Sequence, residues 1–574
     1  MLSIRTFSKT PCVFVVLAAV AILAASSLVA APAPAAPAAP AAAPAVTARP
    51  VRPDDLFRIV GDARPIRLVL GAKDANDLKS ALGTPSLFAY TYADYQGNAL
   101  ASGIAQRDAA TQTITLPPPP AAVVENGAFV EIVFPGLQQK IGLLYGAKPP
   151  AQPDEFFGLD GSFSWAPANA GSEERFRSHL TIFQQSGIAW NRDRFRWRAL
   201  HPAKDAPLDF NTISHTAYRR VASEMGIKTL DTFHDTPAWL RVADPESQSH
   251  RNNPYPMQLE TAAEDWLKIV KNYQPTLQAL EVWNEPDYVA FGKNFPADQI
   301  MSFTKAVSSK LREAGLETRI VGGVFMALHA GSVMQRGYIE NGLLDSSDVV
   351  SWHTYRRAGL LQTPVLAWRK LAAQMNPERA GIPVWITEMG FPWLYQKGMR
   401  RSASAGDIDS ASELAAKATE YKALGIEKNF AFTYKWYNEG GDGNGYGMTD
   451  ASMTPMRTMA SWATAAKTLA HFDYIGDLRG TNARRARVFE NPQTGKSIAV
   501  LYHPVNEKAA IAHFIFPENL PLEKVTGADG RVLKTTKAGA VAVAWGGGGG
   551  TGFTAPHHDG RAYLPFSSKP PAPF

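Results

Sequence analysis

The segment LEVWNEPD, residues 280–287, carries the strongest local signal in the chain. It is a β-rich run that brings the carboxylate of Glu285 to the end of a predicted strand, just before a proline halts regular structure. A second carboxylate, that of Glu388, lies at the end of another predicted strand in PVWITEMG, residues 383–390. Gly390 marks the turn that follows it. The sequence therefore offers two glutamates, each at the end of a strand.

Both segments belong to a long alternating pattern. Between residues 150 and 470, strand-like runs and amphipathic helical runs follow one another eight times. Apolar residues at spacings of three and four from Ile300 to Ala314, for example, predict a helix that ends before Gly315. The strands are expected to end near Asp160, Arg194, His234, Glu285, Phe325, Tyr355, Glu388 and Trp436. This alternation predicts an α/β fold, a (β/α)8 TIM barrel over residues 151–472.

The barrel gives the two glutamates a common location. On this strand order Glu285 and Glu388 end strands four and seven, on opposite sides of the barrel mouth, where the chemistry of such barrels takes place. Their side chains can then converge across the mouth, which is the arrangement that two-carboxylate glycoside hydrolysis requires. The alternative is that each is an exposed loop carboxylate, the usual location of glutamate.

Short apolar runs separated by turn residues flank the barrel. From residue 54 to residue 150 they occur at 66–70, 86–92, 129–134 and 141–145, and from 473 to 574 at 486–489, 498–502, 511–516 and 541–545. Strands of this length between turns predict a small all-β, sandwich-like domain on each side of the barrel.

The first thirty residues have the three parts of a secretory signal. Arg5 and Lys9 precede an unbroken apolar run over residues 13–25, and small residues follow. Extended to residue 31, the apolar segment has 19 residues, so an uncleaved membrane anchor is the alternative to a removed signal peptide. Residues 31–53, rich in Ala and Pro, predict a semi-rigid linker. We expect a secreted or periplasmic protein, anchored to a membrane only if the signal segment is retained.

The composition of the 574 residues excludes several classes of protein. Lys plus Arg number 58 against 52 Asp plus Glu, and no long block of like charges is present, so a nucleic-acid platform is not expected. The single cysteine, Cys12, lies in the signal segment. A disulfide framework, a thiolate zinc cluster and a catalytic thiol are therefore excluded from the folded part.

The tetrapeptides WNEP at 283–286 and TEMG at 387–390 resemble the two signature segments of clan A glycoside hydrolases, the retaining (β/α)8 enzymes. The WNEPD form is most similar to glycoside hydrolase family 39 and its exopolysaccharide-degrading relatives, over roughly residues 156 to 470. The resemblance implies Glu285 as general acid/base, Glu388 as nucleophile and Asn284 as the amide that holds the sugar 2-hydroxyl. The implied activity is cleavage of β-glycosidic bonds in an extracellular oligosaccharide or polysaccharide by double displacement, with no cofactor or metal.

The sixth strand carries a histidine and a tyrosine on one face. His353 and Tyr355 share that face by alternation, and His-x-Tyr at this place is similar to the clan's pair near the nucleophile. We therefore expect both to line the substrate site and Tyr355 to hydrogen-bond Glu388. A structural histidine and a core tyrosine are the alternative.

Arginines occur at every other position from residue 192 to residue 196, so alternation places them on one face of the second strand. The segment WNR at 190–192 resembles the one whose arginine supports the nucleophile, which favours Arg192, with Arg194 and Arg196 as competitors. Glu281, on the same strand face as Glu285, is a candidate to neutralise the charge of one of these arginines.

Aromatic residues near the strand ends are candidate sugar platforms, since apolar sugar faces pack on indole. Trp436 and Trp239 are assigned to substrate binding on this ground, together with His234 at the end of the third strand. Core packing is the alternative for both tryptophans. Trp283, Trp385 and Trp436 are also expected to surround a buried carboxylate and raise its pKa, which suits the acid.

The same residues allow two rival functions. His234, His329 and His353 near strand ends would suit a metal-dependent hydrolase, although no HExxH or comparable spacing is present. A noncatalytic carbohydrate-binding barrel would use the same groove, whereas the flanking β domains show no aromatic triad for glycan binding. The loops at 389–407 and 438–455 are long enough to wall a groove, which favours an oligosaccharide or polysaccharide ligand.

Overall fold

The computed structural model describes residues 46–72, 87–125, 127–165, 172–194, 196–210, 214–232, 235–241, 255–274, 276–292, 296–329, 332–439, 443–478, 485–502, 511–515, 524–532, 540–544 and 550–555. The expected signal segment and all but the end of the expected linker lie outside these residues. None of the described helices is both long and apolar enough to cross a membrane.

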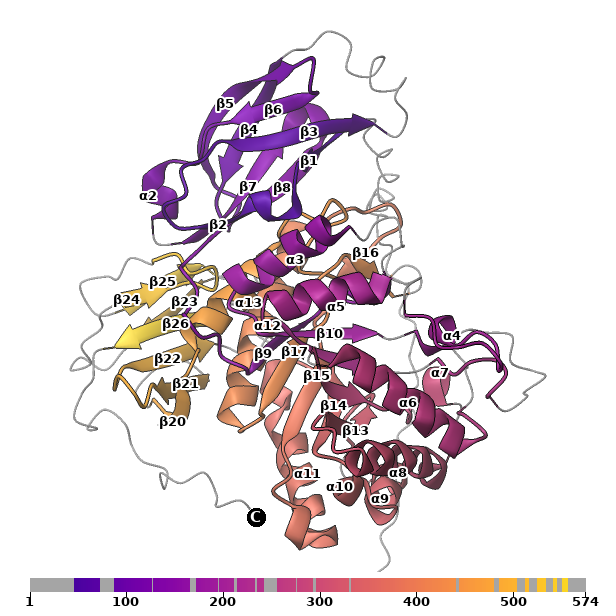
Figure 1. Ribbon diagram of the computed structural model, residues 1–574. Helices are drawn as coiled ribbons and strands as arrows, with labels where there is room; N and C mark the ends of the chain where they lie inside the picture. Colours follow the sequence, from indigo (N-terminus) through magenta and orange to yellow (C-terminus); the bar gives the residue numbers. More distant parts are fainter. Residues whose placement is uncertain are drawn as a thin grey trace, which may run out of the picture. The chain divides into compact units, whose positions relative to one another are not determined.

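Eight parallel strands close into a barrel, which confirms the predicted fold class (Figure 1). In chain order they are β9 (Phe157–Asp160), β10 (Trp190–Arg194), β11 (Lys228–Thr232), β12 (Leu277–Glu281), β13 (Arg319–Phe325), β14 (Val349–Thr354), β15 (Val384–Met389) and β17 (Lys428–Ala431). Each pairs with the next, and β17 pairs back with β9 through Asn429 opposite Phe157. The carboxyl ends of all eight strands therefore lie at one end of the barrel, its catalytic face.

Helices in the connections between the strands surround the barrel. The longer ones are α3 (Glu173–Gln185), α5 (Ser214–Glu224), α6 (Leu259–Tyr273), α8 (Ala297–Glu313), α9 (Val333–Glu340), α11 (Gln362–Met375), α12 (Ser404–Ala423) and α13 (Arg457–Thr468). The helix predicted before Gly315 is α8, in which Ile300, Phe303 and Leu311 are buried on one face. Gly315 has a φ of 68° just beyond its end, where glycine tolerates a left-handed backbone.

Strands four and eight end earlier than predicted. Strand β12 ends at Glu281 rather than at Glu285, because the backbone at Glu285 has a φ of 45°, outside the extended region that a strand requires. The Glu285 N–H donates instead to the carbonyl of Val324 at 3.1 Å. Strand β17 ends at Ala431 rather than near Trp436. The fourth-strand carboxylate therefore stands on a turn fixed to the neighbouring strand.

The barrel interior below the catalytic face is aromatic. The rings of Trp190 and Trp385 lie 5.5 Å apart, and Phe430 packs against both. The indole N–H of Trp385 donates to Glu427, while that of Trp283 donates to the carbonyl of Phe291. Both indole N–H groups are thus bonded to groups other than the two glutamates, and the expectation that Trp283 and Trp385 surround a catalytic carboxylate stays a prediction.

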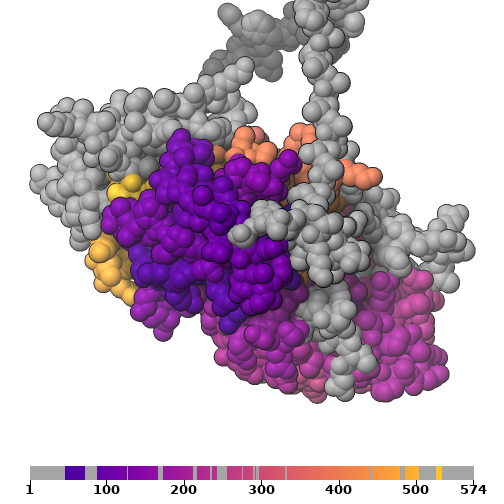
Figure 2. Space-filling view, turned by 90° about the horizontal axis from the view of Figure 1, so that it is seen from above, coloured from indigo at the N-terminus to yellow at the C-terminus, as the bar shows by residue number. Residues whose placement is uncertain are grey.

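The residues before the barrel form one eight-stranded sheet, the indigo surface nearest the viewer in Figure 2. Its strands are β1 (Val46–Pro50), β2 (Phe57–Ile59), β3 (Ile66–Ala72), β4 (Leu87–Ala93), β5 (Ala99–Asp108), β6 (Thr113–Leu116), β7 (Ala128–Phe134) and β8 (Gln139–Gly146), in the order β1-β3-β6-β5-β4-β7-β8-β2. Strand β5 pairs with β4 over most of its length and with β6 at Arg107 and Asp108, so it joins the two halves of the sheet.

The described residues after the barrel also form sheets. Strands β20 (Asp473–Asp477), β21 (Arg485–Glu490), β22 (Ser497–Tyr502), β26 (Gly550–Ala555) and β24 (Lys524–Thr526) make one sheet, and β23 (Ile511–Ile515) pairs with β25 (Ala540–Ala544). All-β regions on both sides of the barrel agree with the predicted fold class.

Buried ion pairs tie these sheets to barrel helices. Arg457 of α13 donates to both carboxylate oxygens of Glu131 in β7, at 3.0 and 3.1 Å. Arg487 of β21 does the same to Glu420 of α12, at 2.9 and 2.8 Å. Removal of one partner from such a pair leaves a buried charge, at a typical cost of about 3 to 5 kcal/mol.

Candidate active site

Glu388, near the end of β15, is surrounded by hydrogen-bond donors. Arg192 Nη1 and Arg194 Nη2 donate to its Oε2 at 2.6 and 2.8 Å, and the Tyr355 hydroxyl donates to its Oε1. Burial alone raises the pKa of Glu388, but the charges of His353, Arg192 and Arg194 outweigh it and lower that pKa to about 2. The carboxylate is therefore ionised at neutral pH.

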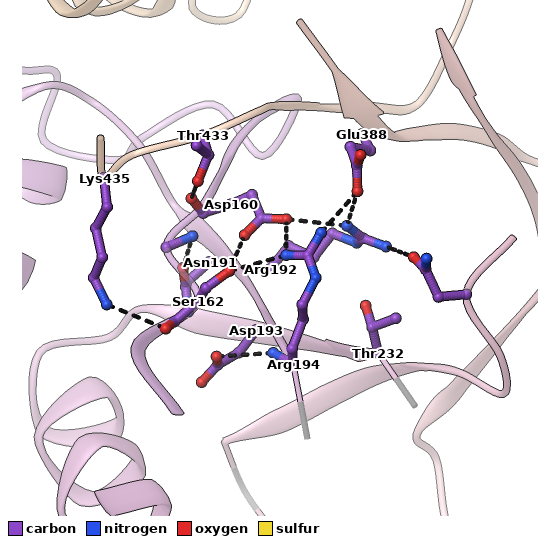
Figure 3. A network of polar contacts seen from close by, with 12 residues as sticks. Asp160, Ser162, Asn191, Arg192, Asp193, Arg194, Thr232, Glu388, Thr433 and Lys435 are labelled. Carbon is purple, nitrogen blue, oxygen red and sulfur yellow. Dashed lines mark hydrogen bonds and ion pairs between the residues drawn. The ribbon is translucent and has the colours of Figure 1, made fainter. Parts of the chain in front are cut away.

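Arg192 is the centre of a buried polar network, part of which Figure 3 shows. Besides Glu388, its fully buried guanidinium binds Asp160 at 3.0 Å and Glu281 Oε2 through two nitrogens at 2.9 and 2.8 Å. It also donates to Oδ1 of Asn284 at 2.9 Å. Since that amide oxygen is occupied, the NH2 group of Asn284 is the part free to be presented to a ligand.

Glu285 faces Glu388 at the mouth of the barrel. It is 8% exposed, and its Oε1 lies 2.6 Å from Nδ1 of His353. One carboxylate oxygen of Glu285, one of Glu388 and a ring nitrogen of His353 all lie within 4.8 Å of one another. The two glutamates predicted from separate strands are thus brought into one buried cluster.

His353 lies between the two glutamates. Burial lowers the pKa of His353, but the charge of Glu388 and the hydrogen bond to Glu285 outweigh it, so the pKa is raised above its usual value. Its Nδ1 is also 3.9 Å from Glu388 Oε2. A proton on this ring therefore reduces the repulsion between the two carboxylates.

Two of the three candidate arginines at the second strand contact Glu388. Arg192 and Arg194 both bind Glu388, and Arg194 also binds Asp160 at 2.5 Å. Arg196 is exposed, with its guanidinium 5.7 Å from the ring of Trp165. Glu281 neutralises Arg192, as the sequence allowed.

Trp436 is stacked against another tryptophan. Its ring lies 5.4 Å from that of Trp393 at an interplanar angle of 25°. The two loops expected to wall a groove meet here, because β16 (Trp393–Tyr395), β19 (Gly443–Tyr446) and β18 (Tyr437–Asn438) form a three-stranded sheet. Trp436 is half-buried, with one face packed on Trp393.

Two further residues, Trp239 and His234, were predicted to contact the substrate. The indole N–H of Trp239 donates to the carbonyl of His201 at 3.0 Å, and its ring lies 4.7 Å from the His201 ring. No contact between Trp239 and either glutamate is present among the described residues, so its role in binding stays a prediction. His234 lies outside the described residues.

Sequence reasoning missed the residues that support the arginines. Asp160 at the end of β9 binds Arg192 and Arg194 and accepts from the Ser162 hydroxyl at 2.7 Å. The Ser162 carbonyl accepts from Lys435 at 3.1 Å (Figure 3). Asp160 lies at a predicted strand end, and this position at the barrel mouth could have indicated its role. No local sequence pattern indicated Ser162.

A third carboxylate approaches the pair from the eighth βα connection. The pKa of Glu439 is raised, first by burial and then by the charges of Glu388 and Glu285. Tyr446, which packs 5.4 Å from Tyr355, hydrogen-bonds Glu439. The mouth therefore contains several acidic groups, of which Glu388 and Asp160 are each bound by Arg192 and Arg194.

The cluster of Glu285, His353 and Glu388 also has the donor atoms of a metal site. However, Oε2 of Glu388 already accepts from two guanidinium groups. Positive charges at 2.6 and 2.8 Å oppose the binding of a further cation there. The arrangement thus suits proton transfer and nucleophilic attack better than metal coordination.

No protein-family model and no curated protein matches the sequence. Among solved structures, the chain is similar to a family 39 glycoside hydrolase from the gut symbiont Bacteroides cellulosilyticus WH2, with a TM-score of 0.61 at 16% identity, over 83% of this chain and 96% of that chain. It is also similar to a family 39 β-xylosidase from Caulobacter crescentus, with a TM-score of 0.48 at 14% identity, over 71% of this chain and 98% of that chain. The first likeness confirms the fold that the sequence resemblance implied.

Proposed function

We propose that the chain is a retaining glycoside hydrolase that cleaves β-glycosidic bonds, with Glu388 as nucleophile and Glu285 as general acid/base. The observation that carries this proposal is the approach of the two buried carboxylates, in which one oxygen of Glu285 lies within 4.8 Å of one oxygen of Glu388. Carboxyl groups in retaining enzymes are about 5 to 5.5 Å apart, against about 6.5 to 9.5 Å in inverting ones. An oxygen-to-oxygen approach this close favours the retaining arrangement over the inverting one.

The surroundings of the two glutamates differ in the way that the two roles require. Glu388 accepts from two arginines and a tyrosine, and these donors favour the anion that attacks the anomeric carbon. Among the described residues, Glu285 accepts a side-chain hydrogen bond from His353 alone, so it can gain and lose a proton at its other oxygen. The charge environment thus supports the assignment of roles.

The reaction then has two steps. Glu388 Oε attacks the anomeric carbon while Glu285 gives its proton to the departing oxygen, which forms a glycosyl ester on Glu388. In the second step Glu285 takes a proton from water, the water oxygen attacks the anomeric carbon, and the ester bond breaks. We assign the amide NH2 of Asn284 to the sugar 2-hydroxyl, a role supported by the bond from Arg192 to the amide oxygen.

The substrate that we propose is an extracellular oligosaccharide or polysaccharide. The joined loops that carry Trp393 and Trp436 support an extended site beside the barrel mouth. We also propose that a signal peptide at residues 1–30 directs export and that a linker follows at 31–53. The catalytic domain is then residues 151–472, with all-β domains at 54–150 and 473–574 on either side. Membrane attachment would require retention of the signal segment.

A panel of aryl β-glycosides and β-glycans, with sizing of the products, tests the activity. Proton NMR of the first-formed product anomer tests the mechanism, since two displacements retain the β configuration. The Glu388→Gln variant should be inactive on every substrate that the native chain cleaves. Tight binding of a glycan without any cleavage would favour the noncatalytic carbohydrate-binding barrel, and inversion of configuration would exclude Glu388 as nucleophile.

A further inference from the structure

A hollow lies between the first strand of the N-terminal sheet and the barrel. It is a groove of about 410 Å³, lined by the chain from Thr47 to Pro53, by residues 172–178 at the start of α3, by Arg400 and by residues 451–453. The α3, Arg400 and 451–453 segments follow β9, β15 and β17, three strands adjacent in the barrel. These walls are therefore βα connections at the same end of the barrel as the two glutamates.

The groove is strongly cationic. Four arginines line it, Arg49, Arg52, Arg175 and Arg400, against one carboxylate, Glu174. Arg52 is bound to Asp54 at 3.0 Å, and Arg400 donates to Ser452 Oγ at 3.3 Å. Within the described part of the chain, the exposed guanidinium groups of Arg49 and Arg175 have no carboxylate within ion-pair distance. Planar guanidinium groups of this kind bind carboxylate and sulfate through paired N–H donors.

The groove adjoins the polar network of the catalytic centre. Burial lowers the pKa of Lys435 to about 8, and the positive charge of Arg175 contributes to that shift, so the two cations lie within reach of one another's field. Lys435 donates to the carbonyl of Ser162, and the hydroxyl of Ser162 accepts from Arg194 Nη1 at 2.9 Å. Arg194 in turn binds Glu388 (Figure 3). Polar contacts through Lys435, Ser162 and Arg194 therefore lead from the side of the barrel mouth that carries the groove to the catalytic centre.

We propose that this groove is a subsite for an anionic group, a carboxylate or a sulfate ester, carried by the glycan whose bond the two glutamates cleave. The substrate class is then an acidic oligosaccharide or polysaccharide. The statement that the acidic glycan is cleaved rests on the proposed glycosidase function. The statement that the groove binds its anionic group does not. Within the described residues, a neutral glycan would leave the guanidinium groups of Arg49 and Arg175 without anionic partners. The groove volume is in the range of about 300 to 1,000 Å³ found for ligand sites.

Binding to the full-length Glu388→Gln variant tests the proposal without turnover. Cello-oligosaccharide, its carboxylated counterpart cellouronate and sulfated cello-oligosaccharide share one β-linked backbone and differ in charge. At low salt we expect at least one of the two anionic probes to bind about tenfold more tightly than the neutral one, and the preference to shrink as salt screens the charges. Which anion is preferred distinguishes carboxylate from sulfate. Equal affinities for all three probes would overturn the proposal.

Matched arginine variants distinguish the groove from general charge. Arg49→Gln with Arg175→Gln should remove most of the preference for the anionic probe, and the corresponding lysine pair should keep part of it. The control is Arg67→Gln with Arg177→Gln, which removes the same charge from the strand paired with β1 and from the same helix, outside the groove lining. Equal loss in the control pair would overturn the proposal, and thermal melts check that both pairs are folded.

The proposed function and this inference fail in different experiments. Hydrolysis of uncharged aryl β-glycosides by the native chain, and its loss in Glu388→Gln, reports on the catalytic centre alone. The anion preference reports on the groove, because the binding measurement requires no cleavage.

Discussion

The guanidinium of Arg192 on β10 binds the carboxylate of Glu388 on β15 at 2.6 Å, although β9 and β17 separate the two strands on the shorter way around the barrel. The bond therefore crosses the mouth of the barrel instead of joining neighbouring strands. Because the same guanidinium binds Asp160 and Glu281, it fixes the position of Glu388 relative to two further strands. This cross-barrel contact both orients Glu388 and keeps it anionic.

Arg192→Lys should move the acidic limb of the pH–rate profile to higher pH. Lysine keeps one positive charge but cannot donate to four partners in the fork geometry of arginine. Since Arg192 lowers the pKa of Glu388, weaker contact should raise that pKa and lower kcat by about 10- to 100-fold. The profile of kcat against pH measures both effects. Arg196→Lys is the matched control on the same segment, and an equal shift in that variant would contradict the assignment.

Tyr355→Phe should reduce kcat with little change in the stability of the fold. The substitution removes the hydroxyl that donates to Oε1 of Glu388 and keeps the ring that packs against Phe432 and Tyr446. A hydrogen bond to a charged group contributes about 1.5 to 3 kcal/mol, so a loss of about 10- to 100-fold is expected. Steady-state kinetics and a thermal melt of the same preparation make the comparison. An unchanged kcat would show that Tyr355 does not support the nucleophile.

Glu388 should also make the fold sensitive to acid. Its pKa is lowered from 4.5 to about 2, so the stabilisation by the ionised form is fully present above pH 4.5 and is lost as the pH falls toward about 2. Between about pH 6 and about pH 3, the free energy of unfolding should fall by about 2 kcal/mol more in the native chain than in Glu388→Gln. Urea titrations at the two pH values measure this difference. Parallel losses in the two proteins would mean that Glu388 is not held as an anion.

Exhaustive chelation should leave the activity intact. The reaction derived above uses protons and a covalent ester on Glu388, and the two arginines on this carboxylate oppose a bound cation. Activity before and after EDTA treatment is the measurement. Loss of activity that zinc restores would instead favour a metal site at Glu285, His353 and Glu388, and an unchanged thermal melt would exclude loss of a structural ion as the cause.

The location of the two glutamates at the same end of the barrel could be predicted because the alternation of strands and helices is a local, repetitive signal. Glu388 lies in β15 as expected, and Arg192 and Tyr355 both contact it. The turn at Glu285 was not predicted, because its positive φ depends on a hydrogen bond to Val324 of the next strand. Periodicity indicates which face a side chain occupies but not where a strand stops pairing.

Contacts between distant segments account for most of what the sequence did not show. Trp436 stacks on Trp393 because two long loops pair through β16, β18 and β19, and alternation within either loop carries no sign of this. The joint contact of Arg192 and Arg194 with Glu388 depends on side-chain length and on the carboxylate of Asp160 between them. The cationic groove likewise brings together arginines far apart in the chain.

Chemical rescue by azide tests the division of roles between the two glutamates most directly. Glu285→Ala should still form the glycosyl ester from an activated aryl β-glycoside, whose leaving group needs little protonation, and then stall because no base activates water. Azide requires no base, so it should restore turnover and yield the β-glycosyl azide. Rescue of Glu388→Gly with an α-glycosyl azide, while Glu285→Ala stays inactive on the activated substrate, would contradict the account and exchange the two roles.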